Sequence, residues 1–102
     1  MNKVIVLEVV ESHGCNSRRR IGDKSYFDGA GNLLTERSPK KICVFALSNA
    51  VMMIFTVSEM PYAGVDPNTM RFKWTHCFDA GLQCGGWGRI VLDLHVEDSR
   101  TA

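Results

Sequence analysis

The segment 42–60 constrains the fold of this chain most, because fourteen of its nineteen residues are apolar. Ser38 followed by Pro39 is a helix-start signal, since the serine hydroxyl can accept an exposed amide and proline is tolerated at the first helical position. Pro61 cannot continue a helix, because it lacks the amide hydrogen. The sequence therefore predicts one helix over residues 39–59 that is apolar on most of its sides.

A helix that is apolar nearly all round is either a core helix or a membrane span. Ser48, Asn49 and Thr56 interrupt the segment, and its apolar length is marginal for a span of about 20 residues. We therefore expect a core helix and no membrane. Because a core covers only part of such a helix, we also expect contact between subunits and hence a homo-oligomer.

The segments on both sides of this helix read as strands. Residues 3–11 are apolar on both faces, which is typical of a central strand. In residues 89–97 the apolar side chains alternate, so that one face points toward a core. Shorter strands are expected at 24–27, before an Asp28-Gly29 turn, and at 70–78. The predicted fold class is α+β, a small antiparallel sheet of four to five strands packed on one long apolar helix.

Length and charge narrow the function classes. A chain of 102 residues fits a single α+β domain, 1–102, in which 98–102 form a polar tail. Twelve basic and eleven acidic residues leave a net charge of +1, which provides no field for a nucleic acid. Glu8 interrupts the first apolar run and no small-residue cleavage site follows, so we expect a cytoplasmic protein with reduced cysteines.

The cysteines and histidines form the first candidate site. The chain has four cysteines, at positions 15, 43, 77 and 84, with no CxxC pair. Cys15, Cys77 and Cys84, with His13 as a fourth ligand, are the candidate metal set, because zinc and iron accept thiolates and imidazoles. The alternative is that these cysteines are packed as small apolar side chains.

A glycine-rich turn over residues 84–88 forms the second candidate site. Its glycines would let a ligand approach the backbone closely, and its tryptophan would wall a small pocket. The predicted ligand pocket consists of Tyr26, Trp74, His76, Gly85, Gly86 and Trp87. The alternative is a tight, bulged connection between strands whose tryptophan caps the core.

Four features together carry a family resemblance: Cys15 ahead of Ile21-Gly22-Asp23, the strand around Ser25–Gly29, Cys43 opening the apolar helix, and Cys77 with Asp79 behind it. Over residues 4–97 the chain resembles an uncharacterised family of short cysteine-bearing proteins common in anaerobic bacteria and archaea. It departs from that family at residues 66–68 and 84–88. The resemblance implies a small α+β unit that serves a larger anaerobic enzyme system, with cysteines 15, 43 and 77 as the shared positions.

Three hypotheses for function follow, and the simplest is a purely structural subunit whose apolar helix packs at an interface between subunits. The hypothesis we favour is a small binding or accessory protein that self-associates and holds a metal, a small ligand or a partner enzyme at its Cys/Gly-rich surface. The alternative is a small enzyme that acts on an aromatic or carboxylate substrate, with Cys77 or His76 carrying the chemistry. No catalytic motif is assembled in the sequence, so catalytic residues are not assigned and enzymatic activity stays open.

Overall fold

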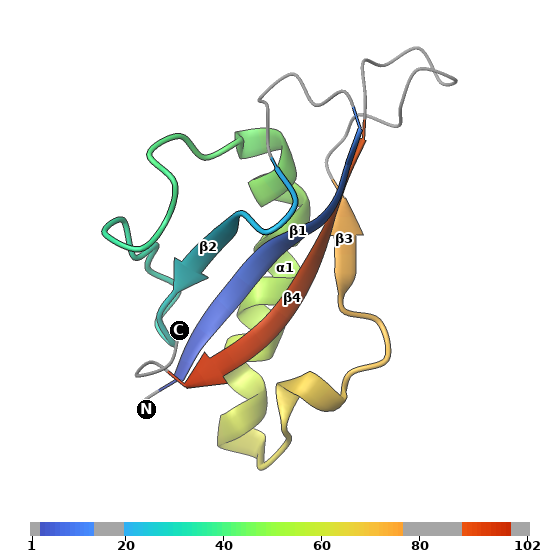
Figure 1. Ribbon diagram of the computed structural model, residues 1–102. Coiled ribbons are helices and arrows are strands. Elements are labelled where there is room, and N and C mark those ends of the chain that lie inside the picture. Colours follow the sequence, from blue (N-terminus) through green and yellow to red (C-terminus); the bar gives the residue numbers. More distant parts are fainter. Residues whose placement is uncertain (1–2, 14–19, 77–88, 99–102) are drawn as a thin grey trace.

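The computed structural model describes residues 3–13, 20–76 and 89–98 (Figure 1). These residues form a four-stranded antiparallel sheet with one helix against one of its faces. The elements are β1 (Lys3–His13), β2 (Lys24–Phe27), α1 (Val44–Glu59), the 3-10 helices η1 (Met60–Ala63) and η2 (Pro67–Thr69), β3 (Trp74–His76) and β4 (Arg89–Asp98). The strand order is β2-β1-β4-β3, so the two long strands lie in the middle. The predicted α+β class is confirmed.

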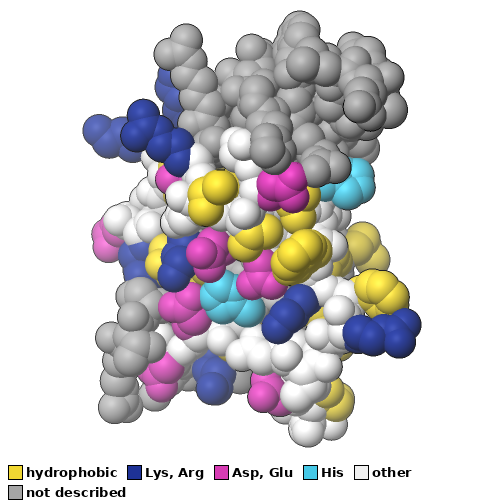
Figure 2. All heavy atoms as spheres, turned by 45° about the vertical axis from the view of Figure 1, so that its right-hand side comes forward, with side chains coloured by type: hydrophobic (Ala, Val, Ile, Leu, Met, Phe, Trp, Pro, Cys, Tyr) yellow, Lys and Arg dark blue, Asp and Glu magenta, His cyan; other side chains and the backbone are white. Residues whose placement is uncertain are grey.

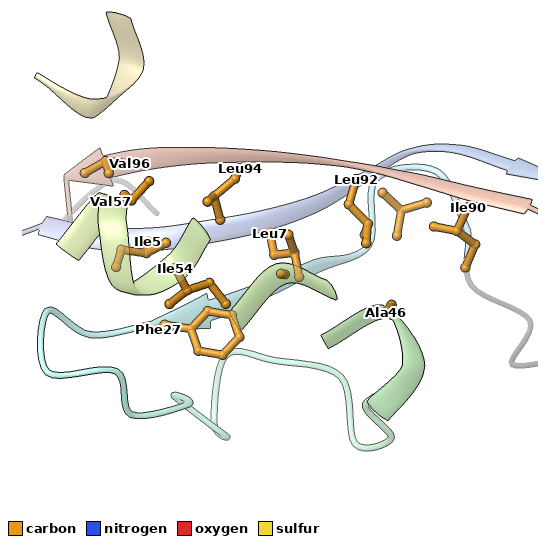
Figure 3. Close-up of a cluster of buried hydrophobic side chains, with 12 residues drawn as sticks. Ile5, Leu7, Phe27, Ala46, Ile54, Val57, Ile90, Leu92, Leu94 and Val96 are labelled. Atoms are coloured by element: carbon orange, nitrogen blue, oxygen red, sulfur yellow. The ribbon is translucent and has the colours of Figure 1, made fainter. Parts of the chain in front are cut away.

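The core lies between α1 and the inner face of the sheet (Figure 3). The alternation predicted for the last strand is confirmed, because its four inward positions are all at most 8% exposed. In Figure 3 the side chain of Phe27 from β2 lies against Ile54 from α1. The buried cluster consists of Ile5, Leu7, Val9, Phe27, Ala46, Ala50, Ile54, Val57, Ile90, Leu92, Leu94 and Val96. The apolar segment is thus a core helix on this side.

The predicted start of the helix is wrong by five residues, because α1 begins at Val44. The hydroxyl of Ser38 accepts a hydrogen bond from the backbone amide of Tyr26 at 2.9 Å, so it caps the edge of β2 instead of a helix. Cys43 is the residue that precedes α1, and its side chain makes no capping hydrogen bond. The predicted end is confirmed at Glu59, where Pro61 enters η1.

The edge strand β3 is shorter than the predicted strand over 70–78. Ladder pairing covers Trp74–His76, and the amide of Leu94 donates to the carbonyl of Lys73 at 2.7 Å. Farther along β4 the partner of Val96 is the side-chain amide of Asn68 in η2. A side chain therefore replaces the backbone of a longer edge strand. Residues 77 and 78 of the predicted strand lie outside the described residues.

Strand β1 is central, as predicted, but it is not uniformly buried. A register shift between Val9 and Glu11 leaves Val10 as an extra, half-buried residue. Both backbone groups of Val9 bond to the segment before β2, the amide to the carbonyl of Asp23 at 2.9 Å and the carbonyl to the amide of Gly22 at 2.8 Å. Gly22 has a φ of 94°, a conformation that favours glycine.

Candidate functional site

The outer face of the sheet, opposite α1, carries a layer of polar side chains over two buried valines. Val4 and Val6 of β1 are 3% and 0% exposed. Val6 is paired with Tyr26 on one side and with His95 on the other, and Val4 is paired with Glu97. These longer cross-strand neighbours cover the valines, because paired side chains on one face of a sheet lie in contact.

A four-residue cluster, Lys24, Asp93, His95 and Glu97, forms the centre of this layer. We call it the outer-sheet cluster. The Nδ1 of His95 lies 2.7 Å from Oδ2 of Asp93, and its Nε2 lies 2.6 Å from Oε2 of Glu97. The Nζ of Lys24 lies 3.5 Å from the same Glu97 oxygen. In Figure 2 acidic and basic side chains gather around a histidine near the middle of the face shown.

Within the outer-sheet cluster, Lys24 and Glu97 stabilise each other's charged form. A hydrogen bond from His95, assisted by the charge of Lys24, holds the pKa of Glu97 below its ordinary value. The charge of Glu97 in turn raises the pKa of Lys24. An ionised carboxylate can only accept a hydrogen bond, and a neutral imidazole has only one N–H donor. Both contacts of His95 are therefore hydrogen bonds when the imidazole ring carries a proton on each nitrogen.

The polar groups of the outer-sheet cluster bind mainly to one another. Both ring nitrogens of His95 are taken by carboxylates within the cluster. In the described part of the chain, no group of three histidine, cysteine, aspartate or glutamate side chains is placed to hold a metal ion. We therefore interpret this cluster as the polar cover of the sheet.

The predicted ligand pocket is not brought together in the described residues. Tyr26 is in β2 and Trp74 is in β3, at opposite edges of the sheet with β1 and β4 between them. The guanidinium of Arg37 lies over the Tyr26 ring, 4.6 Å from its centroid. Trp74 and His76 do alternate onto one face of β3, as predicted. The other three predicted pocket residues, Gly85, Gly86 and Trp87, lie outside the described residues.

The predicted metal ligands Cys15, Cys77 and Cys84 also lie outside the described residues, and of His13 only the backbone is described. His13 is paired with Arg89, and His76 is paired with Val91. The described residues that flank segments 14–19 and 77–88 therefore lie at the same end of the sheet. The remaining cysteine, Cys43, packs half-buried against the core.

The outer side of α1 is a second apolar surface. Five residues of α1 and one of η1 are large, apolar and 50–74% exposed. They are Val44, Phe45, Val51, Met52, Phe55 and Tyr62, and we call them the α1 patch. The hydroxyls of Ser48 and Thr56 donate to carbonyls of the same helix at 2.6 and 2.9 Å. The sequence indicated this surface through the composition of the segment, although not which residues lie on it.

A groove of about 440 Å³ adjoins the α1 patch. It lies between the second half of α1 and the turn after β2, where Asp28 accepts hydrogen bonds from the amides of Ala30 and Asn32. Its wall is mostly apolar and includes Phe27, Leu33, Leu47, Val51, Ile54 and Phe55. Because Val51 and Phe55 belong to both features, the groove and the α1 patch form one continuous surface.

By length and composition alone, the stretch Val44–Ala63 would also suffice to cross a membrane. The inner side of α1, however, is packed on the sheet through Ala46, Ala50, Ile54 and Val57. On this side α1 packs as a core helix, and 28% of the 18-residue apolar window within the stretch is buried.

Comparisons of this chain with family models, with curated proteins and with solved structures produced no match. The resemblance to short cysteine-bearing proteins of anaerobes therefore stays a prediction.

Proposed function

We propose that this chain is a small binding protein that works as a self-associated assembly, with the α1 patch as the contact between copies. The observation that carries the proposal is that α1 is apolar on two opposite sides, of which its own sheet buries only one. An apolar side that remains in water costs solvation free energy, and association with a second such side removes that cost.

The size of the α1 patch suits such a contact. From their exposed fractions, its six side chains expose on the order of 700 Å², close to the roughly 800 Å² per partner of a stable interface. The hydroxyls of Ser48 and Thr56 already have acceptors within the helix. Burial of the patch therefore leaves these donors satisfied, which removes the usual penalty for burying a polar group.

The described edges of the sheet offer little to a strand-adding partner. At the β2 edge, Tyr26 uses its amide on Ser38 and its carbonyl on the amide of Leu34. At the other edge, the side chain of Asn49 donates a hydrogen bond to the carbonyl of His76 at 2.7 Å. The side-chain amide of Asn68 is hydrogen-bonded to both backbone groups of Val96. Backbone groups that already have partners cannot template another strand. This supports the helix, and not a sheet edge, as the contact.

The Cys/Gly-rich segments remain the proposed surface that holds a metal, a small ligand or a partner enzyme. The support from the described residues is the position of His13, His76 and Arg89 at one end of the sheet. In this proposal the assembly presents that end of each copy to the bound species, while α1 holds the copies together.

Sedimentation equilibrium from micromolar to near-millimolar concentration tests self-association. We expect a dimer or larger assembly for the wild type and a monomer for Phe55→Ser, with unchanged circular dichroism. Trp74→Ser is the matched control, because Trp74 is a similarly exposed aromatic residue whose strand partner Asp93 belongs to the outer face. A wild-type monomer over the whole range would refute the proposal, and so would equal disruption by Trp74→Ser.

A further inference from the structure

We infer that two copies pair with their α1 helices antiparallel, so that the start of one helix lies against the groove beside the end of the other. This inference rests on the proposed self-association and adds its geometry. The occupant of the α1 patch and of the groove is thus a second copy of this chain. Three observations on the described residues carry it.

The first observation is the distribution of charge along the helix. Glu59, at the last position of α1, is exposed and is the only charged residue of the helix. Lys40 and Lys41, just before the helix, are both exposed. In an antiparallel pair each lysine-bearing end faces Glu59 of the other copy, whereas a parallel pair would place like charges together. Charge complementarity of this kind selects the orientation of paired helices.

The second observation concerns the ends of α1. Its first turn carries no acidic side chain, its last turn carries no basic one, and Cys43 makes no capping hydrogen bond through its side chain. The partial positive charge at the start of the helix and the partial negative charge at its end are therefore not balanced by residues of α1 itself. Antiparallel pairing brings Glu59 of the second copy, and the end of its helix, toward the uncompensated start.

The third observation is the position of the groove. The α1 residues that line the groove lie between Leu47 and Glu59, and most of them belong to the second half of the helix. Val44 and Phe45, at the other end of the helix, are 62% and 63% exposed. The helix is about 24 Å long, and antiparallel pairing over that length sets the first turn of one copy opposite the groove of the other. The exposed apolar first turn of each copy then lies beside the apolar groove of the other.

A charge-reversal cycle tests the orientation, with the dimer dissociation constant measured at low ionic strength. Each contact occurs twice in a symmetric dimer. We therefore expect Glu59→Lys and Lys40→Glu, each alone, to weaken dimerisation about fivefold, because attraction becomes repulsion at both contacts. The combined variant should return to within about twofold of the wild type. About 1 M salt should abolish these differences by screening.

The outcomes separate this inference from the proposed function. If the wild type is a monomer, both fail. If the wild type is a dimer that Phe55→Ser dissociates, but neither single reversal changes its dissociation constant, the contact stands and antiparallel pairing is refuted. Parallel pairing predicts that result, since each reversal replaces one like-charge pair by another. If the combined variant dimerises more weakly than either single variant, so that the two effects on the dissociation constant add, the inference is also refuted.

Discussion

The side-chain amide of Asn68 forms two hydrogen bonds with the backbone of Val96, donating to its carbonyl at 2.9 Å and accepting from its amide at 2.8 Å. The amide group of a side chain thereby takes the place of a peptide group in the sheet ladder. Asp66 fixes the turn that presents it, because its carboxylate accepts from the backbone amide of Asn68 at 3.0 Å. This arrangement explains why the edge beside β4 needs only three residues of regular strand.

Replacement of Asn68 by alanine should lower the free energy of unfolding by about 1–2 kcal/mol, because the two part-buried hydrogen bonds to the backbone of Val96 are lost. Asn68→Asp should also destabilise, since a carboxylate cannot donate to the Val96 carbonyl. Urea denaturation measures both. Thr35→Ala, at an exposed turn position, is the control and should change stability by less than about 0.5 kcal/mol. If Asn68→Ala changes the free energy of unfolding no more than this control does, the Asn68–Val96 hydrogen bonds contribute nothing to stability.

Local patterns predicted the parts of the fold that depend on near neighbours. Alternation identified the inward positions of β4, and Pro61 marked the end of α1, because both signals act within a few residues. Ser38 was misassigned because its partner is the backbone of Tyr26, twelve residues away and across a turn. A capping signal in the sequence cannot reveal that a strand edge competes for the same hydroxyl.

The separation of Tyr26 from Trp74, two residues of the predicted pocket, could not be foreseen for a similar reason. Tyr26 and Trp74 are both aromatic, but the strand order that separates them depends on long-range pairing, which composition does not encode. The outer-sheet cluster could be predicted in part, because Asp93, His95 and Glu97 alternate onto one face of a strand. Lys24 could not, since it is 73 residues from Glu97 in sequence and adjacent to it only through β1.

The two sides of α1 should respond differently to truncation. Ile54→Ala removes a buried side chain from the core and should cost about 2–4 kcal/mol in monomer stability. Met52→Ala, two residues earlier and 70% exposed, should change the stability of the monomer by less than about 0.5 kcal/mol, yet weaken self-association. Urea denaturation at low protein concentration and sedimentation at high concentration measure the two effects. If Ile54→Ala and Met52→Ala lower the stability of the monomer equally, Met52 does not lie on an exposed outer side of α1.

Acid should weaken the fold through the outer-sheet cluster. The pKa of Glu97 is lower in the folded state than its ordinary value of 4.5, so the unfolded chain binds this proton more readily. Its stabilising contribution is complete above that value and is lost as the pH falls through the lower, folded pKa. Since the hydrogen bond from His95 is the main cause, His95→Gln should reduce the acid-induced loss.

Urea midpoints between pH 7 and pH 3 measure this dependence, with Glu97→Gln as the reference that lacks the titrating group. Asp28 contributes a loss of the same sign, because hydrogen bonds from Asn32 lower its pKa, and that loss persists in every variant. The difference between wild type and Glu97→Gln therefore isolates the cluster. Identical acid dependence in the two proteins would rule out its role.

Protein purified without chelator and without oxygen should contain zinc or iron at near-stoichiometric level, if the predicted set of Cys15, Cys77 and Cys84 with His13 is correct. The described residues that flank these positions lie at one end of the sheet, which is the condition for ligands far apart in sequence to meet. Elemental analysis measures the metal, and a thiolate charge-transfer band would identify iron. Cys84→Ser should lose the ion, whereas Cys43→Ser should retain it, because Cys43 packs against the core beside α1. If the wild-type protein is colourless and metal-free, or if both variants lose the metal equally, the predicted metal site is refuted. The cysteines would then be packed as small apolar side chains.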